Sequence, residues 1–363
     1  MNRLGEKLVA GETGGGQGRG FQGGGADRGS ARRGRFRGGP SPRERFPIGP
    51  GDEEKSFDFQ GRRRTCIVHV PPGFDRSRAL PLVLVLHGGI VNAYFTARNT
   101  GMSATADREG FIAVYPNGTG RFEDRILTWN VGFGYAYALH NKVDDVGFLR
   151  ELIAHMVAEY GADHRRVYAT GISNGGGMSY RLASEASDLV AAVAPIAGAS
   201  AGREREGAPL VIFPAPTRPV SVIAFHGMQD RMIPFGGGAG AGLANAVYLP
   251  VQESIDMWIG YDGCSPAPET WASPSGNIVR DWYSGGREGS EVVLYSIRDG
   301  GHSWPGGTAV FAGEGGAAGS PQQRQGFMAE RIRSRFTELI GATTHEISAN
   351  DLMWEFFKRH TRS

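Results

Sequence analysis

The sequence predicts a doubly wound α/β fold, in which helices cover both faces of a mostly parallel sheet. Continuous apolar runs such as Leu82–Leu86 are typical of strands that are buried on both faces. Segments with helical apolar spacing alternate with these runs along the chain, which favours parallel strands with helical crossovers. Polar residues follow several strands directly, and ligand sites of doubly wound sheets lie at these carboxyl ends.

Length and composition suit one large α/β domain or two small ones. The 363 residues are 40% hydrophobic, which is enough for a full core over residues 61–363. A formal charge of +2 does not indicate an acidic partner. No apolar run approaches the ~20 residues of a membrane span, so no membrane partner is predicted. The N-terminus shows no apolar signal-peptide region, which favours a cytoplasmic location.

Residues 1–60 differ from the rest of the chain because glycine and arginine dominate them. Such a segment buries too little apolar surface to offset its ordering entropy, so we expect a disordered tail. An alternative is that the arginines, with Phe21 and Phe36, bind single-stranded nucleic acid by charge and stacking. A solvated tail, or a wrongly chosen upstream start codon, is the preferred interpretation, so nucleic acid is the less favoured partner.

The secondary-structure elements follow from their apolar patterns. The predicted strands cover residues 66–70, 81–86, 111–115, 167–170, 190–194, 220–225 and 292–297. The predicted helices, each with one apolar stripe, cover residues 145–160, 251–259 and 349–360. Asp144 and Asp145 precede the first of these helices, so we interpret them as an N-cap and an acidic first turn rather than as an acid–base or metal pair.

A strand, a tight turn and a helix surround Ser173. The apolar run 167–170 leads into Gly171-Ile172-Ser173-Asn174-Gly175, a Gly-x-Ser-x-Gly pattern, and a helix-compatible segment follows. The two glycines allow a turn so tight that larger neighbours would collide, and the turn raises the serine hydroxyl above the sheet. The pentapeptide alone also fits an ordinary glycine-rich turn, so other residues must decide its role.

Two further strand ends carry an acid and a base. Asp230 follows the strand 220–225, and His302 follows the strand 292–297. A serine hydroxyl needs a base to take its proton, which His302 can supply while Asp230 holds the imidazole tautomer. Taken singly, Asp230 also fits a turn cap and His302 a loop residue. Together, in the order Ser, Asp, His at successive strand ends, they predict a catalytic triad.

Two backbone N–H groups are expected to form an oxyanion hole. Gly89 ends an early strand at the place where such folds put one donor, and Asn174 follows the nucleophile at the helix start. His87 and Gly88 precede Gly89 and are predicted to contact substrate, although His87 also fits a buried strand-end histidine.

Three other residues are candidates for the substrate pocket. Trp129 and Asn130 lie in a loop between a strand and a helix, and Trp304 follows His302 by two positions. A packing role for Trp304 is an equal alternative. No His, Cys, Asp or Glu cluster has metal-ligand spacing, and no glycine-rich stretch fits a dinucleotide or phosphate loop. The prediction is therefore no metal and no cofactor.

These motifs together resemble the polyhydroxybutyrate depolymerase-type esterases, which are similar to the feruloyl and acetylxylan esterases of the α/β-hydrolase superfamily. The resemblance runs from about residue 63 to the C-terminus. It is carried by Leu86-His87-Gly88-Gly89, Tyr115-Pro116-Asn117-Gly118, Trp129-Asn130, Val143-Asp144-Asp145-Val146-Gly147, Gly171-Ile172-Ser173-Asn174-Gly175-Gly176, His226-Gly227 to Asp230, Gly301-His302-Ser303-Trp304-Pro305-Gly306 and residues 349–357.

The resemblance implies an α/β-hydrolase with Ser173 as nucleophile, Asp230 as acid, His302 as base and no cofactor. Many members of the family are secreted and contain disulfides, which favours an extracellular location. Cys264 stands where the family often has a paired cysteine, but the stretch around Tyr283 offers no partner. Cys66 and Cys264 are therefore predicted to stay free. The segments 199–218 and 307–331 are longer than expected and are predicted to reshape the substrate cleft.

The predicted function is serine carboxylester hydrolysis through an acyl-enzyme on Ser173. The substrates are feruloyl, acetyl or hydroxyalkanoate esters, either small molecules or the chain end of a polymer. One alternative is an RNA-binding protein that uses the tail, with the folded domain as its carrier. A peptidase on the same fold is less favoured, because nothing resembles a substrate-gating domain. The sequence does not indicate an oligomeric state.

Overall fold

The computed structural model describes residues 48–363 except 123, 135, 243–245 and 308–336. The described residues belong to one compact unit. The greater part of the predicted tail and of the segment 307–331 lies outside the described residues, so the predictions for them stay predictions. No helix in the described part of the chain has the length and apolarity that a membrane crossing requires.

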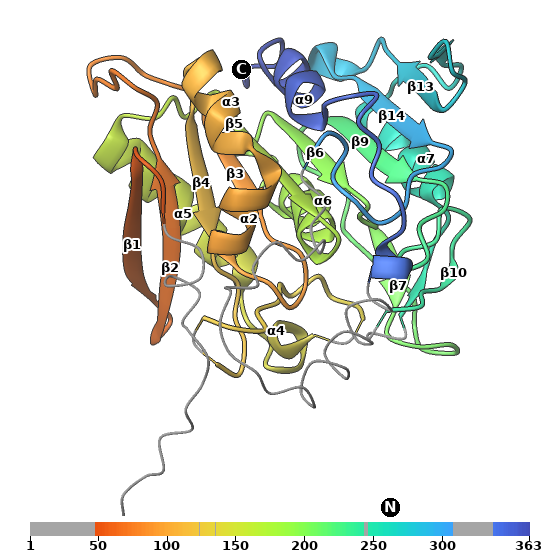
Figure 1. Ribbon diagram of the computed structural model, residues 1–363, viewed down its shortest axis with the longest axis horizontal. Helices are drawn as coiled ribbons and strands as arrows, with labels where there is room; N and C mark the ends of the chain where they lie inside the picture. Colours follow the sequence, from red (N-terminus) through yellow and green to blue (C-terminus); the bar gives the residue numbers. More distant parts are fainter. Residues whose placement is uncertain (1–47, 123, 135, 243–245, 308–336) are drawn as a thin grey trace, which may run out of the picture. The chain divides into compact units, whose positions relative to one another are not determined.

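A ten-stranded sheet organises this unit, in the order β1-β2-β4-β3-β5-β6-β9-β14-β13-β12 (Figure 1). The strands from β4 to β14 in this order are parallel, and both edges are antiparallel. The strands are β1 Asp52–Phe59, β2 Arg62–His69, β3 Leu82–Leu86, β4 Ile112–Pro116, β5 Val167–Ile172, β6 Ala192–Ile196, β9 Ser221–Gly227, β12 Glu269–Ala272, β13 Ile278–Tyr283 and β14 Val292–Ile297. The predicted α/β-hydrolase sheet is confirmed.

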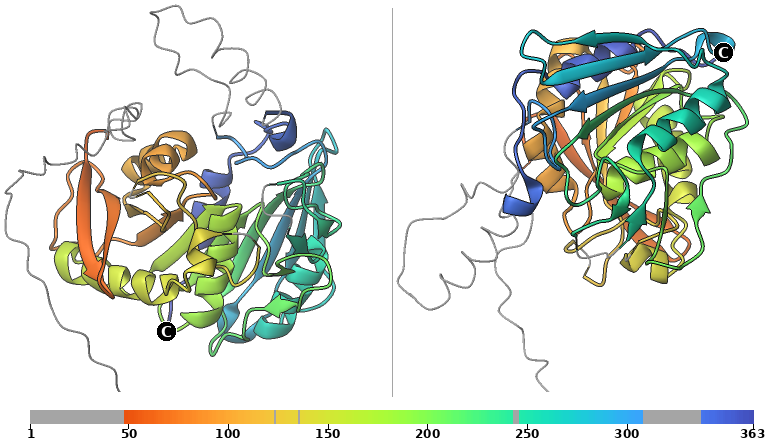
Figure 2. Two further views of the ribbon diagram at one scale, coloured as in Figure 1. Left: turned by 90° about the horizontal axis from the view of Figure 1, so that it is seen from below. Right: turned by 90° about the vertical axis from the view of Figure 1, so that its right-hand side faces the viewer.

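Helices cover both faces of the sheet, as predicted (Figure 2). The principal helices are α2 Ala93–Thr100, α3 Met102–Glu109, α5 Asp145–Tyr160, α6 Asn174–Glu185, α7 Val251–Asp262 and α9 Ala349–Phe357, and α4 Tyr137–His140 and the 3-10 turn Arg287–Gly289 are short. Each of the predicted helices is present.

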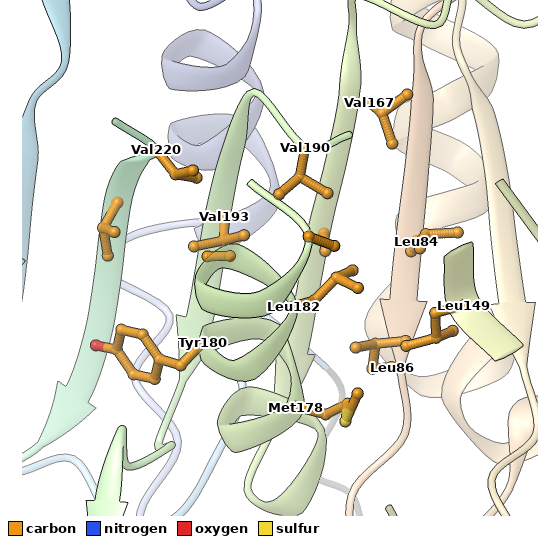
Figure 3. Close-up of a cluster of buried hydrophobic side chains, with 14 of the residues drawn as sticks. Leu84, Leu86, Leu149, Val167, Met178, Tyr180, Leu182, Val190, Val193 and Val220 are labelled. Atoms are coloured by element: carbon orange, nitrogen blue, oxygen red, sulfur yellow. The ribbon is translucent and has the colours of Figure 1, made fainter. Parts of the chain in front are cut away.

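Each face of the sheet has its own hydrophobic core because side chains alternate along a strand. Leu82, Leu84 and Leu86 of β3 pack with α5, α6 and α7 in one cluster. Figure 3 shows part of this cluster, including Leu84 and Leu86. Val83 and Val85 pack with α2, α3 and α9 in the other. Burial on both faces explains why the run is continuously apolar.

The folded domain begins earlier than predicted. The boundary at residue 61 is wrong, because β1 already pairs with β2 in an antiparallel hairpin. Gln60 and Gly61 connect the two strands with positive φ angles of 49° and 72°, the pattern of a type I′ turn. The strand was missed because β1 is rich in charged residues and, at the edge of the sheet, buries only one face.

A small second sheet comes partly from the segment 199–218, which was predicted to be a long loop, and partly from residues 238–248. Its order is β10-β11-β7-β8, and all its pairs are antiparallel. The strands are β7 Ala201–Arg203, β8 Val211–Ile212, β10 Gly238–Ala239 and β11 Val247–Tyr248. We call it the accessory sheet. Tyr248 of this sheet packs edge-on against Phe133, with ring centroids 6.3 Å apart.

Candidate active site

Ser173 lies at the turn between β5 and α6, where a nucleophile elbow was predicted. Its φ and ψ angles are 60° and −121°, a conformation that costs an L-residue about 1–3 kcal/mol. Hydrogen bonds hold the turn, because the Ser173 N–H donates to the Ile196 carbonyl at 2.9 Å and the Ser173 carbonyl accepts from the Gly177 N–H at 2.9 Å. A Cβ at Gly171 would lie 2.6 Å from the Gly175 carbonyl oxygen, so only glycine fits there.

Asp230 and His302 meet beside this turn. They come from the ends of β9 and β14, which are neighbours in the sheet, and the His302 Nδ1 lies 2.7 Å from the Asp230 Oδ2. Both residues are buried. The His302 Nε2 is also buried and has no hydrogen-bond partner among the described residues, Ser173 included. Serine–base contacts are often longer in the absence of substrate.

Further hydrogen bonds hold the Asp230 carboxylate. Its Oδ1 accepts from the N–H groups of Met232 and Ile233 at 2.8 and 2.9 Å, and the His226 Nε2 lies 3.4 Å from its Oδ2. Burial acts to raise the pKa of Asp230, but the charge of His302 and the hydrogen bonds from His226 and His302 outweigh it and hold this pKa well below the usual range. The carboxylate is therefore ionised at neutral pH.

Two cavities adjoin the Ser173 hydroxyl. The larger one, of about 230 Å³, has an apolar lining that includes Val131, Phe133 and Tyr248. The smaller one, of about 70 Å³, is lined by residues that include Phe95 and His302. Ser173 lines both, so a substrate carbonyl at its hydroxyl would have one group on each side.

The two predicted oxyanion donors lie at this position. Gly89 lines both cavities and Asn174 lines the larger one. A Cβ at Gly89 would lie 3.7 Å from the Asn174 Cβ, so the two backbones are close. Neither N–H group donates a hydrogen bond within the described chain, and the first N–H groups of a helix have no partner inside it.

Three of the predicted substrate-contacting residues form hydrogen bonds within the protein, and their contact with substrate stays a prediction. His87, Trp129 and Asn130 line neither cavity. The fully buried Trp129 donates its indole N–H to the His87 carbonyl at 3.0 Å, and its main-chain N–H and carbonyl bind the Asn174 side chain. The Asn130 N–H donates to Asp145.

His87 anchors the loop that carries Gly88 and Gly89. Its Nδ1–H donates to the Gly88 carbonyl at 2.7 Å, and its Nε2 accepts from the Gly118 N–H at 2.8 Å. This pattern requires a neutral imidazole. Burial lowers the pKa of His87 to about 4, and the nearby Arg64 charge acts in the same direction.

Gly88 and Trp304 do line the smaller cavity, as predicted. The Trp304 indole N–H donates to Asn350 Oδ1 at 2.9 Å, which fixes the ring in the wall. Both alternatives for Trp304, packing and lining, therefore apply.

Several residues near the site were missed or only partly understood. Asp144 caps α5 as predicted, accepting from the Gly147 N–H at 2.8 Å. Asp145, however, forms a buried ion pair with Arg64, whose Nη2 lies 2.7 Å from its Oδ1. The contact spans two elements far apart in sequence, so no local pattern signalled it. Phe133 and Tyr248 carried no sequence signal either.

Comparisons with known proteins agree with this geometry. Residues 65–209, which include Ser173, match the family model described as Esterase PHB depolymerase. The chain is 28% identical over 242 residues to Feruloyl esterase B of Piromyces equi, covering 66% of this chain but only 42% of that protein. It is 28% identical over 246 residues to Feruloyl esterase C of Emericella nidulans, covering 66% of this chain and 76% of that protein.

Among solved structures, an acetyl xylan esterase from Aspergillus awamori is 17% identical to this chain, with a TM-score of 0.48. The match covers 69% of this chain and 94% of the esterase chain. The fold assignment itself rests on the strand order above. The resemblance found in the motifs is confirmed, because residues 65–209 match the family model of the polyhydroxybutyrate depolymerase-type esterases.

Proposed function

We propose that this protein is a serine carboxylester hydrolase that forms an acyl-enzyme on Ser173. The observation that carries the proposal is the buried Asp230–His302 pair beside a strained serine. The His302 Nε2 has no hydrogen-bond partner within the described chain, and His302 lines a cavity together with Ser173. A base that is held on one nitrogen and open on the other suits proton transfer to and from a hydroxyl.

In this mechanism the Ser173 Oγ attacks the ester carbonyl carbon while its proton passes to the His302 Nε2. The negative charge moves to the carbonyl oxygen, which accepts hydrogen bonds from the N–H groups of Gly89 and Asn174. His302 then returns the proton to the alcohol oxygen as the bond between carbon and alcohol oxygen breaks. Water attacks the acyl-enzyme with His302 again as base, and the carboxylic acid and the free serine are formed.

Asp230 supports each of these steps through His302. Its carboxylate accepts from the His302 Nδ1–H, so the Nε2 carries the lone pair that the reaction needs. Because its pKa lies well below the usual range, it remains an anion when the imidazole becomes positively charged.

The substrates proposed from the relatives are feruloyl, acetyl or hydroxyalkanoate esters. Two relatives are named feruloyl esterases, and the matching family model names a depolymerase. A panel of methyl ferulate, acetylated xylan, short hydroxybutyrate oligomers and p-nitrophenyl esters distinguishes these classes by kcat/KM.

The role of Ser173 is tested by Ser173→Ala, for which we expect no measurable turnover and an unchanged melting temperature. The exposed Ser265→Ala is the matched control and should keep wild-type turnover. A serine-directed phosphonate should inactivate the wild type, with the mass increase on the peptide that contains Ser173. Undiminished turnover in Ser173→Ala, or a label on another serine, contradicts the proposal.

A further inference from the structure

The two cavities beside Ser173 differ in which catalytic groups they contain. Ser173, Gly89 and Met232 line both. His302 lines only the smaller cavity, whereas Asn174 lines only the larger one. The ester carbonyl must lie at the shared residues, so its two substituents enter different cavities.

Proton transfer decides which substituent enters which cavity, an argument that rests on the proposed function. The leaving alcohol oxygen must receive its proton from the His302 Nε2, so the alcohol lies on the side of His302. The acyl chain continues from the carbonyl carbon in the opposite direction, on the side of Asn174. We therefore propose that the larger cavity binds the acyl group of the ester and the smaller cavity binds the alcohol.

The volumes set the sizes of the two groups. An apolar cavity of about 150 Å³ in another protein holds benzene. The acyl cavity, of about 230 Å³, therefore accepts a benzene ring with a short linker or a medium-length alkyl chain. The alcohol cavity, of about 70 Å³, holds a group such as methyl or ethyl completely, so a larger alcohol such as a ring must extend beyond it and forms fewer contacts.

The lining of the acyl cavity adds a chemical preference. No charged side chain lines it among the described residues, so the acyl group should be neutral. The side chains of Thr128 and Asn174 are already hydrogen-bonded within the protein.

Tyr248 also lines this cavity, but its hydroxyl forms no hydrogen bond within the described chain. Burial is the main cause that raises the pKa of this phenol to about 12, so it is neutral at neutral pH. Tyr248 is therefore the specificity residue for a polar substituent on the acyl group.

The first experiment compares two isomers that differ only in the side of the ester that carries the ring. Methyl phenylacetate has a bulky acyl group and a small alcohol, and benzyl acetate has the reverse. The two leaving alcohols have similar acidity, and the alkaline hydrolysis rates correct for the remaining difference in reactivity. We expect kcat/KM of the wild type to be at least about tenfold higher for methyl phenylacetate.

Two alanine variants then test each cavity separately. Phe95→Ala enlarges the alcohol cavity and should lower the ratio of kcat/KM between methyl phenylacetate and benzyl acetate. Phe133→Ala removes a wall of the acyl cavity and should impair methyl phenylacetate more than methyl acetate. Opposite shifts in these ratios, or a wild-type preference for benzyl acetate, would overturn the assignment.

Tyr248→Phe tests the polar contact, since it removes only the hydroxyl. It should lower kcat/KM about fivefold for methyl 3-(4-hydroxyphenyl)propionate and leave methyl 3-phenylpropionate within twofold. Equal effects on both esters contradict the role of Tyr248.

If the protein hydrolyses neither isomer and no ester of the substrate panel, the proposed function itself is contradicted. Hydrolysis with the wrong preference contradicts only the cavity assignment.

Discussion

The proposed nucleophile and the proposed acid–base pair are positioned by different physical means. Ser173 is held by the main chain, in a turn where the neighbouring backbones leave room only for glycine. Asp230 and His302 are held by side-chain hydrogen bonds and by charge, on two loops that follow neighbouring strands. Sterically defined positions should respond abruptly to an added methyl group, whereas electrostatically defined positions should lose rate but keep their shape.

The largest effect is expected from Gly175→Ala. The new Cβ would lie 2.3 Å from the Leu86 carbonyl oxygen and 2.5 Å from that of His87, both backbone atoms at the end of β3. The start of α6 must then move away from β3 and take Ser173 with it. We expect no detectable turnover and a loss of more than about 4 kcal/mol in the free energy of unfolding, measured by urea denaturation.

The control for this prediction is Gly260→Ala in α7. Gly260 is exposed, and its added Cβ would meet nothing within 4 Å. That variant should gain up to about 1 kcal/mol because alanine favours a helix over glycine. Wild-type kcat in Gly175→Ala would show that the turn is not sterically defined.

The next effect is on rate alone, from Asp230→Asn. The asparagine oxygen can still accept from the N–H groups of Met232 and Ile233, so the loop should keep its structure. Its amide N–H₂ would face the His302 Nδ1 and favour the wrong tautomer. By analogy with the serine-protease triad, we expect kcat to fall about 10⁴-fold with little change in melting temperature. A similar kcat would mean that Asp230 only orders its loop.

A third prediction concerns pH, because a neutral His87 holds the loop that carries Gly88 and Gly89. An unfolded histidine takes up its proton near pH 6.5, but the folded pKa of His87 is about 4. Between these values the unfolded chain binds the additional proton, so stability falls as the pH falls. His87 should account for about 3 kcal/mol of this loss between pH 6.5 and 4.

The contribution of His87 is measured against His87→Gln, which cannot take up this proton. Urea unfolding of both proteins across this pH range should show their difference in stability shrinking as the pH falls. A difference that is independent of pH would contradict the assignment.

The smallest effect is expected from reduction. Cys66 and Cys264 are both free and buried, and burial raises the pKa of their thiols to about 12 and about 11. Thiolates are the reactive form, so both cysteines should resist thiol reagents in the native protein and both should react after denaturation. Dithiothreitol should leave the melting temperature unchanged. Denatured, unreduced protein without titratable thiols would indicate a disulfide.

The sequence was most informative where hydrophobicity is continuous. The runs around Leu84 and Val222 identified buried parallel strands, and the strand ends then located Ser173, Asp230 and His302. It was least informative at the accessory sheet, because strands as short as Val247–Tyr248 show no periodicity. β1 was missed for a different reason, since an edge strand needs only one apolar face.

The internal partners of His87, Trp129 and Asn130 could not be predicted, because a side chain's partner cannot be inferred from its neighbours in sequence. Their contact with substrate stays a prediction. The Gly118 N–H that satisfies His87 and the Asp145 carboxylate that binds the Asn130 N–H become adjacent only when the sheet forms. Where a site is built from strand ends the sequence locates it, but the division of polar groups between structure and ligand depends on tertiary contacts.

The accessory sheet has a consequence for how this protein can change over generations. Tyr248 belongs to a sheet separate from the one whose strands lead to Ser173, Asp230 and His302. Mutations there can alter the wall of the larger cavity while the reacting groups keep their places. Selection can therefore search for new substrates in one sheet and keep the proposed chemistry in the other, and directed evolution of this protein should begin at Tyr248 in β11.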